Sequence, residues 1–174
     1  MSLASAAQRV MGKAYLSLGS NLMPAANLAS ALGALRSRFG VVAVSPIYRN
    51  TAIGFEGADF FNAAAVIESD LDPCALNDWL HALEDAHGRD RSGPRFGDRP
   101  LDVDIVFYDR LVLSGDGNLR IPRPELCHAF VLKPLQDIAP KFIDPISGLT
   151  LAQLWEHCPE RALPLQVVET RDLG

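Results

Sequence analysis

Residues 101–108, LDVDIVFY, have the pattern of a β-strand with one buried face. Apolar side chains occupy every second position, at Leu101, Val103, Ile105 and Phe107. Because side chains two residues apart in a strand point to the same side, these four are expected under the helices. Asp102 and Asp104 then share the opposite face, which Val106 and Tyr108 continue. Two neighbouring carboxylates repel each other, and burying them unpaired is costly, so the pair requires a positive partner.

Strand and helix patterns alternate along the rest of the chain. Period-2 alternation predicts further strands at 13–19, 41–48 and 60–69. Helical spacing of leucines predicts helices at 24–39 and 73–87. The resulting order is strand, helix, strand, strand, helix, strand, which predicts an α+β fold, the ferredoxin-like α/β sandwich. We expect an antiparallel sheet with helices packed on one face and a ligand groove under mobile loops on the other.

Smaller signals mark the ends of these elements. Pro46 argues for an edge position or an irregular end of the second strand. Asp72 is expected as the N-cap of the second helix, with Pro73 at its first position and Gly88 at its end. Weaker patterns predict a short strand at 118–121, short helices at 130–138 and 149–157, and a last strand within 164–168.

Length and composition suit one compact domain, because the chain has 174 residues of which 48% are hydrophobic. We expect a flexible leader at 1–12 and a single catalytic domain at 13–174, acting as a monomer.

The net charge of -5 excludes a general electrostatic footprint for nucleic acid. No apolar run is long enough to span a membrane, and the N-terminus lacks the apolar region of a secretory signal. Three cysteines without metal-type spacing indicate reduced thiols in the cytoplasm.

Arginines cluster in the segment before the strand at 101–108, at Arg89, Arg91, Arg95 and Arg99. In one interpretation, Arg95 and Arg99 form salt bridges with the acids on a solvated face. In the other, the two acids hold Mg²⁺, which takes one or two carboxylates together with phosphates and water. The arginines exceed the charge needed to neutralise two aspartates, and arginines on a glycine-bearing loop are typical of phosphate ligands. They favour phosphoryl chemistry, although the chain has no P-loop or protein-kinase signature.

RPLDVDI, residues 99–105, resembles the signature of the 6-hydroxymethyl-7,8-dihydropterin pyrophosphokinase family of the folate pathway. Other segments are similar to that family in the same order: YLSLGSN at 15–21, SPIYRNTAIG at 45–54, DFFNAAAVIES at 59–69, LEDAHGRDR at 83–91, IPRP at 121–124 and FVLKPLQDIAP at 130–140. The resemblance extends from Tyr15 to Trp155. It implies transfer of the β,γ-diphosphate of ATP, the co-substrate, to the hydroxymethyl group of the dihydropterin. AMP is released, and two Mg²⁺ ions are the implied cofactors.

The resemblance also implies roles for individual residues. Asp102 and Asp104 match the Mg²⁺ ligands, and Arg89 and Arg99 match the catalytic arginines that bind phosphate. On the nucleotide side it implies Glu84, Arg91, Arg95, Ile105, Leu119, Arg120, Ile121, Arg123 and His128. On the pterin side it implies Thr51, Ile53, Gly54, Phe60, Asn62 and Phe130.

The pterin-side residues can also be judged by their chemistry. A flat pterin needs aromatic faces and a few polar groups at its edge, and Phe60 and Asn62 offer both on one strand face. Phe60 and Phe130 also suit plain core packing, which is the commoner place for aromatic residues. Asn62 is less ordinary, because asparagine is depleted in strand interiors and must find hydrogen bonds there.

Two positions depart from the family pattern. Arg123 stands where the family usually has a histidine, and His128 where it usually has an arginine. Arginine is a permanent cation, whereas histidine is largely neutral at pH 7. One alternative is therefore a weakly active homologue that binds pterin or nucleotide as a regulatory module. Another is a Mg²⁺-dependent nuclease or nucleotidyltransferase, which the net charge and the lack of a stacking platform for a nucleic-acid strand argue against.

Overall fold

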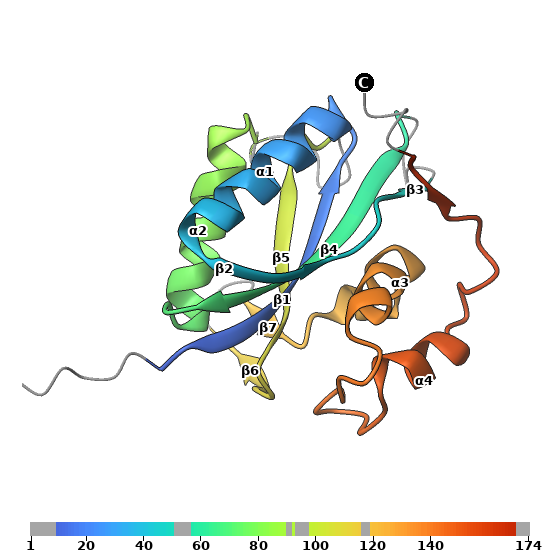
Figure 1. The fold of residues 1–174 in the computed structure, drawn as a ribbon. Coiled ribbons are helices and arrows are strands. Elements are labelled where there is room, and N and C mark those ends of the chain that lie inside the picture. The colour runs from blue at the N-terminus through green and yellow to red at the C-terminus, as the bar shows by residue number, and fades with distance from the viewer. Residues whose placement is uncertain (1–9, 51–56, 90–91, 93–97, 116–118, 170–174) are drawn as a thin grey trace, which may run out of the picture.

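The computed structural model describes residues 10–50, 57–89, 92, 98–115 and 119–169. Within them the main sheet is antiparallel, with strand order β5-β1-β4-β3-β8, and β2 pairs with β4 beside β3 (Figure 1). Its strands are β1 (Gly12–Ser20), β2 (Gly40–Val44), β3 (Tyr48–Asn50), β4 (Phe60–Ser69), β5 (Asp102–Tyr108) and β8 (Gln166–Val167). A second, two-stranded sheet consists of β6 (Leu113–Ser114) and β7 (Arg120–Ile121). The predicted antiparallel α+β fold is confirmed.

The helices are α1 (Pro24–Arg38), α2 (Pro73–Ala86), the 3-10 helix η1 (Pro124–Cys127), α3 (Ala129–Ile138) and α4 (Leu151–Glu156). Asp72 is the N-cap of α2, as predicted, and its carboxylate accepts a hydrogen bond of 2.8 Å from the Ala75 amide. Gly88 follows α2 with a φ of 84°, a left-handed conformation that favours glycine. In the described part of the chain, no helix is long and apolar enough to cross a membrane.

The predicted strand at 41–48 is divided into β2 and β3. Pro46 lies between them, and proline has no amide hydrogen to continue the ladder. Ser45 keeps the chain against β4 at this point, because its amide donates to Ala64 O at 2.9 Å and its Oγ accepts from the Ala64 amide at 2.8 Å. The irregular end predicted at Pro46 is therefore confirmed, and a serine side chain replaces part of the missing ladder.

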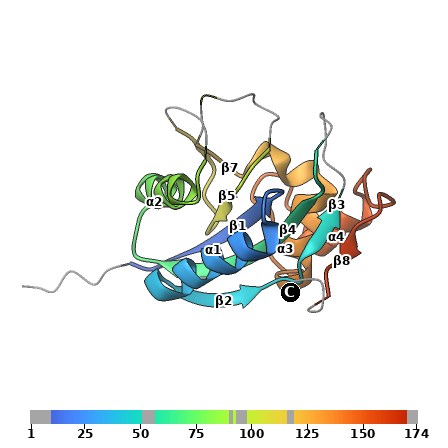
Figure 2. The same ribbon diagram turned by 90° about the horizontal axis from the view of Figure 1, so that it is seen from above.

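Apolar residues pack on both faces of the sheet. The first core lies between one face and helices α1 and α2, and includes Leu16, Leu28, Ile67 and Leu80. The second core lies on the other face, under α3 and α4, and includes Tyr15, Val66, Leu135 and Leu151. The expectation of helices on one face only is wrong, because α3 packs on β4 from the opposite side (Figures 1 and 2). A ligand groove on that face is limited to the part that α3 leaves uncovered.

An extra residue changes the alternation within β5. On β1, Tyr15 pairs with Phe107 and its neighbour Leu16 pairs with Ile105, so Val106 has no partner in the register. Such a β-bulge reverses which side chains face each side of the sheet beyond it.

The bulge places Phe107 in the second core and Tyr108 in the first. Phe107 was expected under the helices with Leu101, and Tyr108 on the opposite face with Asp102. Both expectations are wrong, because a hydrophobic pattern does not reveal an inserted residue. Before the bulge the alternation is intact, with Val103 in the first core. Asp102 and Asp104 therefore do share the face of the second core, where their side chains are 37% and 35% exposed.

Asp137 anchors the C-terminal half of α3 to β3. The Tyr48 hydroxyl donates to Asp137 Oδ2, and Asp137 Oδ1 accepts from Lys133 Nζ at 2.7 Å and from Gln136 Nε2 at 2.6 Å. Burial and then the contact with Asp137 raise the pKa of Tyr48, so its hydroxyl stays protonated and remains a donor.

Gly12→Ala is expected to destabilise the fold, because a Cβ at this position of β1 would overlap the Tyr108 ring. The ring is packed in the first core, and its hydroxyl donates to Leu71 O at 2.6 Å, so it cannot move without loss. Overpacking of this kind lowers the free energy of unfolding by roughly 1–3 kcal/mol, which urea denaturation would measure.

Gly33→Ala is the matched control, because Gly33 is exposed within α1 and an added Cβ would meet no atom within 4 Å. This variant should gain roughly 0.5–1 kcal/mol from its higher helix propensity. Equal stabilities of the two variants would contradict the steric argument for Gly12.

Candidate active site

Asp102 and Asp104 lie at the start of β5, on the sheet face that also carries Asn62 of β4. Gly19 of β1 is the register partner of Asp102 on one side and of Asn62 on the other. Neighbouring strands are about 4.8 Å apart, so the row from Asn62 to Asp102 spans roughly 10 Å. Gly19 adds no side chain to this row, and a Cβ there would lie 3.1 Å from Asn62 Oδ1. No side chain therefore projects from the sheet midway between Asp102 and Asn62, which place polar groups at the two ends of the row.

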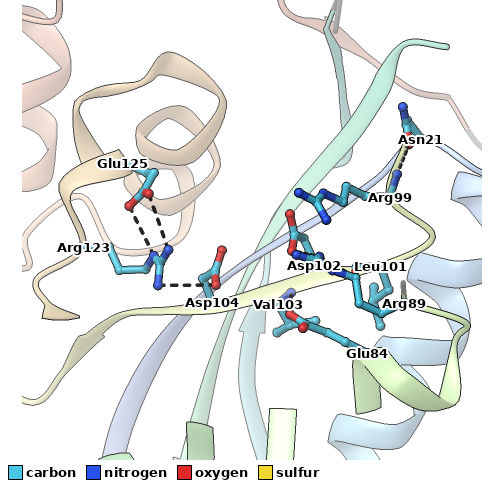
Figure 3. Close-up of polar contacts among 10 residues, drawn as sticks. All are labelled: Asn21, Glu84, Arg89, Arg99, Leu101, Asp102, Val103, Asp104, Arg123 and Glu125. Atoms are coloured by element: carbon cyan, nitrogen blue, oxygen red, sulfur yellow. Dashed lines mark hydrogen bonds and ion pairs between the residues drawn. The ribbon is translucent and has the colours of Figure 1, made fainter. Parts of the chain in front are cut away.

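Arg89 flanks the acids on the side of α2. Its Nη1 pairs with Asp102 Oδ1 and lies 3.4 Å from Leu101 O. Figure 3 shows Arg99 on the same side, with its guanidinium extending toward Asp102. The two arginines predicted to be catalytic are thus brought to the predicted metal ligands.

Arg123 flanks the acids on the opposite side (Figure 3). It follows β7, and its Nη1 lies 3.5 Å from Asp104 Oδ1. Its Nε also lies 3.3 Å from Glu125 Oε2. Arg123 is therefore shared between an acid of β5 and Glu125, an acid that the sequence analysis did not single out.

Glu84 of α2 is only 2% exposed, and its Oε1 accepts a hydrogen bond of 2.9 Å from the Val103 amide. This contact fixes the start of β5 against α2. Although 35% of the Asp104 side chain is exposed, burial raises the pKa of Asp104 to about 7. Arg123 opposes the rise, and the charges of Asp102, Glu84 and Glu125 add to it. The cluster holds more negative charge than its arginines balance, so a bound cation would stabilise it.

Asn21 connects two segments that border the site. Its Nδ2 donates to Ala58 O at 3.3 Å and to Asp98 Oδ1 at 2.9 Å, and its Oδ1 accepts from the Arg99 amide at 2.6 Å. The Asn21 amide also donates to Arg99 O at 3.0 Å. Asn21 thus holds the backbone of Arg99, a role that the sequence analysis missed because GSN at 19–21 has the signal of an ordinary turn.

Asn62 is 4% exposed, and its Nδ2 donates to Oδ1 of Asn50 on β3. Asn50 was not predicted as a site residue. Phe60 is partly exposed on the same strand face as Asn62, whereas Phe61 packs in the first core. The predicted pair of an aromatic face and a polar edge therefore occurs at this end of the row.

His128 lies at the N-terminus of α3, in contact with two partners. Its Nδ1 lies 2.9 Å from Glu160 Oε1, and its ring stacks on the Phe130 ring with centroids 5.1 Å apart and an angle of 10° between the planes. Glu160 Oε2 also accepts a hydrogen bond of 2.9 Å from the Ala129 amide. Burial would raise the pKa of Glu160, but these hydrogen bonds and the charge of His128 lower it overall.

The remaining predicted residues are placed less directly at the site. Ile105, Leu119 and Ile121 are buried together in the first core, and Arg120 is exposed on β7. Arg91, Arg95, Thr51, Ile53 and Gly54 lie outside the described residues. Among the residues that the structure describes, no group of three His, Cys, Asp or Glu side chains could hold a metal ion. A cation at Asp102 and Asp104 would therefore take most of its ligands from phosphate and water, as Mg²⁺ commonly does.

Comparison with known proteins places this site in a family. Residues 15–140 match the family model described as 7,8-dihydro-6-hydroxymethylpterin-pyrophosphokinase. The 2-amino-4-hydroxy-6-hydroxymethyldihydropteridine pyrophosphokinase of Methylorubrum extorquens is 39% identical over 82% of this chain and 91% of its own length. The protein of the same name from Pseudomonas aeruginosa is 36% identical over 84% of this chain and 92% of its own length. The chain belongs to the 7,8-dihydro-6-hydroxymethylpterin-pyrophosphokinase family.

Longer proteins contain a similar unit. The HPPK-DHPS protein of Plasmodium falciparum, solved with pteroate, matches 87% of this chain with a TM-score of 0.71. The sequence identity is 13%, so this likeness shows the fold alone, and the match covers 45% of that chain. Folic acid synthesis protein FOL1 of Dictyostelium discoideum is 32% identical over 83% of this chain, which spans only 22% of that protein.

Asn21→Ala is expected to release the backbone of Arg99. The variant loses three side-chain hydrogen bonds in a position that is 2% exposed, which costs roughly 1–3 kcal/mol. Amide hydrogen exchange should be faster at Arg99, and urea denaturation should show the lower stability.

Asn27→Ala serves as the control, because its partly exposed side chain donates a hydrogen bond of 2.7 Å to Leu22 O. Its stability should stay within about 0.5 kcal/mol of the parent protein. Unchanged exchange at Arg99 in Asn21→Ala would show that other contacts hold this segment.

Proposed function

We propose that this chain transfers the diphosphate group of ATP to the hydroxymethyl group of 6-hydroxymethyl-7,8-dihydropterin in folate biosynthesis. The observation that carries the proposal is the row on one sheet face, with Asp102 and its arginines at one end and Asn62 at the other. Membership of the pyrophosphokinase family supports the same reaction. The roughly 10 Å between the ends leaves room for a flat heterocycle beside a polyphosphate.

The substrate oxygen forms a bond to the β-phosphorus, and the bond from that phosphorus to the oxygen bridging to the α-phosphorus breaks. AMP leaves with the electron pair, and the proton of the hydroxymethyl group passes to solvent. Such a transfer depends on alignment and on stabilisation of negative charge more than on a strong base. Arg89 and Arg99 are the described cations best placed to provide that stabilisation, with Arg123 on the far side of the acids.

We propose that Asp102 and Asp104 would hold two Mg²⁺ ions together with the nucleotide. The residues fit this role, since they are neighbouring carboxylates with partly exposed side chains, and the further acids Glu84 and Glu125 lie close to Asp104. Bound Mg²⁺ would neutralise phosphate oxygens and lower the pKa of the attacking hydroxyl. Before the nucleotide binds, Arg123 and Arg89 offset part of the repulsion between the acids.

In this proposal the pterin and the nucleotide bind on different sides of the site. Phe60, Asn62 and Phe130 bind the pterin, together with Thr51, Ile53 and Gly54. The nucleotide is bound by the loop arginines Arg91 and Arg95, by Arg120 and Arg123, and by the segment Leu119–Ile121 beside Ile105. Glu84 acts by fixing β5, because its carboxylate is buried against the Val103 amide.

We also propose that the chain works as a cytoplasmic monomer with one catalytic domain. Cys74, Cys127 and Cys158 are free thiols, which suits a reducing compartment. Sedimentation of the purified protein at micromolar concentration would test the monomer directly.

The activity is tested by incubating the protein with MgATP, with and without 6-hydroxymethyl-7,8-dihydropterin, and identifying the nucleotide product. AMP that forms only with the pterin supports the proposal. Binding of both ligands without AMP would instead favour the regulatory module, and cleavage of a nucleic acid would favour a nuclease.

Asp104→Asn should reduce turnover by about 100-fold or more, because a metal contribution is worth several kcal/mol in the transition state. Calorimetric titration should show weaker binding of Mg²⁺ with a non-hydrolysable ATP analogue, while the thermal midpoint stays near that of the parent. Asp78→Asn, on the exposed side of α2, is the charge-matched control and should leave both measurements unchanged. Near-normal turnover in Asp104→Asn would refute the metal assignment.

Asn50→Asp should retain the KM for the pterin within about threefold, because an aspartate can still accept from Asn62 Nδ2. Asn50→Ala removes that acceptor, and its KM for the pterin should rise by roughly five- to tenfold. If the KM for the pterin rises more in Asn50→Asp than in Asn50→Ala, Asn50 donates to Asn62 instead, and the orientation of the two side-chain amides is reversed.

A further inference from the structure

The segment after α4 contacts the start of α3 through one carboxylate. Glu160 accepts from the Ala129 amide with Oε2 and from His128 Nδ1 with Oε1, both at 2.9 Å. An amide in the first turn of a helix has no partner within the helix, so an acceptor from elsewhere stabilises this end. Glu160 lies beyond residues 15–140, the part of the chain that matches the family model.

The two contacts of Glu160 fix the plane of the His128 ring. A histidine held at one ring nitrogen, next to a backbone amide held by the same carboxylate, has little freedom to rotate. The ring lies parallel to Phe130, with an interplanar angle of 10° and a centroid distance of 5.1 Å. His128 therefore lies against part of one face of the Phe130 ring and supports it from that side.

In this arrangement the Nδ1 of His128 is occupied by Glu160. Arg89 contacts Asp102, and Arg123 contacts Asp104. The Nδ1 of His128 faces a carboxylate, which would repel a phosphate at the same place. Phe130, by contrast, is partly exposed on the helix that packs on β4, the strand of Asn62.

We propose that Glu160 and His128 are positioning residues for the pterin, which act by holding the Phe130 ring in the plane that the flat substrate stacks on. This inference rests on the proposed function. An aromatic ring with a fixed plane binds a flat ligand with a smaller loss of side-chain freedom than a mobile ring. The effect falls on binding of the pterin, and the phosphate groups of ATP are not involved.

The test compares KM for the pterin with KM for ATP in His128→Ala, His128→Phe and Glu160→Ala. The alanine variants should raise the KM for the pterin by roughly 3- to 10-fold and leave the KM for ATP within about twofold. His128→Phe keeps a flat ring against Phe130 but cannot contact phosphate, so it should recover much of the pterin affinity. Because both residues act through one contact, the double alanine variant should be little worse than either single variant.

Glu156→Gln is the matched control, since Glu156 is exposed on α4 near the same segment and should change neither constant. If Glu160→Ala fails to fold in thermal denaturation, Glu160→Gln retains an oxygen for the Ala129 amide and takes its place. A rise in the KM for ATP with an unchanged KM for the pterin would overturn the proposal, as would no change in either.

Direct titration of 6-hydroxymethyl-7,8-dihydropterin, followed by the intrinsic fluorescence of the ligand, separates this proposal from the proposed function. If the parent protein forms no AMP but binds the pterin, the proposed reaction fails, and weaker pterin binding by His128→Ala still supports the positioning role. If the variants bind the pterin as the parent does, or the parent binds none, the positioning role is refuted.

Discussion

Repulsion between Asp102 and Asp104 is the interaction around which the site is arranged. The two carboxylates share one face of β5, and their neighbours Glu84 and Glu125 add further negative charge. Arg89 and Arg123 approach from opposite sides and offset part of it. Because these arginines come from the end of α2 and from the segment after β7, the charge balance of the site also links distant parts of the chain. A polyphosphate with its cations suits such a cluster, since it supplies both the positive charge that the acids lack and the negative charge that the arginines bind.

Much of the fold follows from local patterns that the structure then confirms. The alternation before Val106, the cap at Asp72 and the break at Pro46 each have a local physical cause that is visible in the sequence. The bulge at Val106 has no such signal, because it depends on how β5 aligns with β1. Helices on both faces were also missed. The apolar residues of α3 indicate a buried side, but they do not say which face of the sheet that side meets.

Some residues of the site could likewise be predicted from the sequence, and others could not. Asp102, Asp104, Arg89 and Arg99 were predicted from a short segment of sequence, and the structure brings them together. Asn21, Asn50 and Glu160 were not predicted, because each acts through partners far away in the chain. A single sequence offers no signal for such pairs. For His128 the family pattern implies a place on the nucleotide side, and the structure adds contacts with Phe130 and Glu160 that the pattern does not reveal.

Helix α3 is held near both ends, by Glu160 at its first residue and by Tyr48 through Asp137 in its last turn. Because α3 is short and is held near both ends, it cannot rotate about either contact alone. The backbone that carries Phe130 is therefore tied to β3 through Asp137 and to the segment after α4 through Glu160. If the pterin stacks on Phe130 as proposed, the distance between α3 and the sheet sets the thickness of the ring system that fits, so a thicker, non-planar ring system should bind less well even with an identical polar edge.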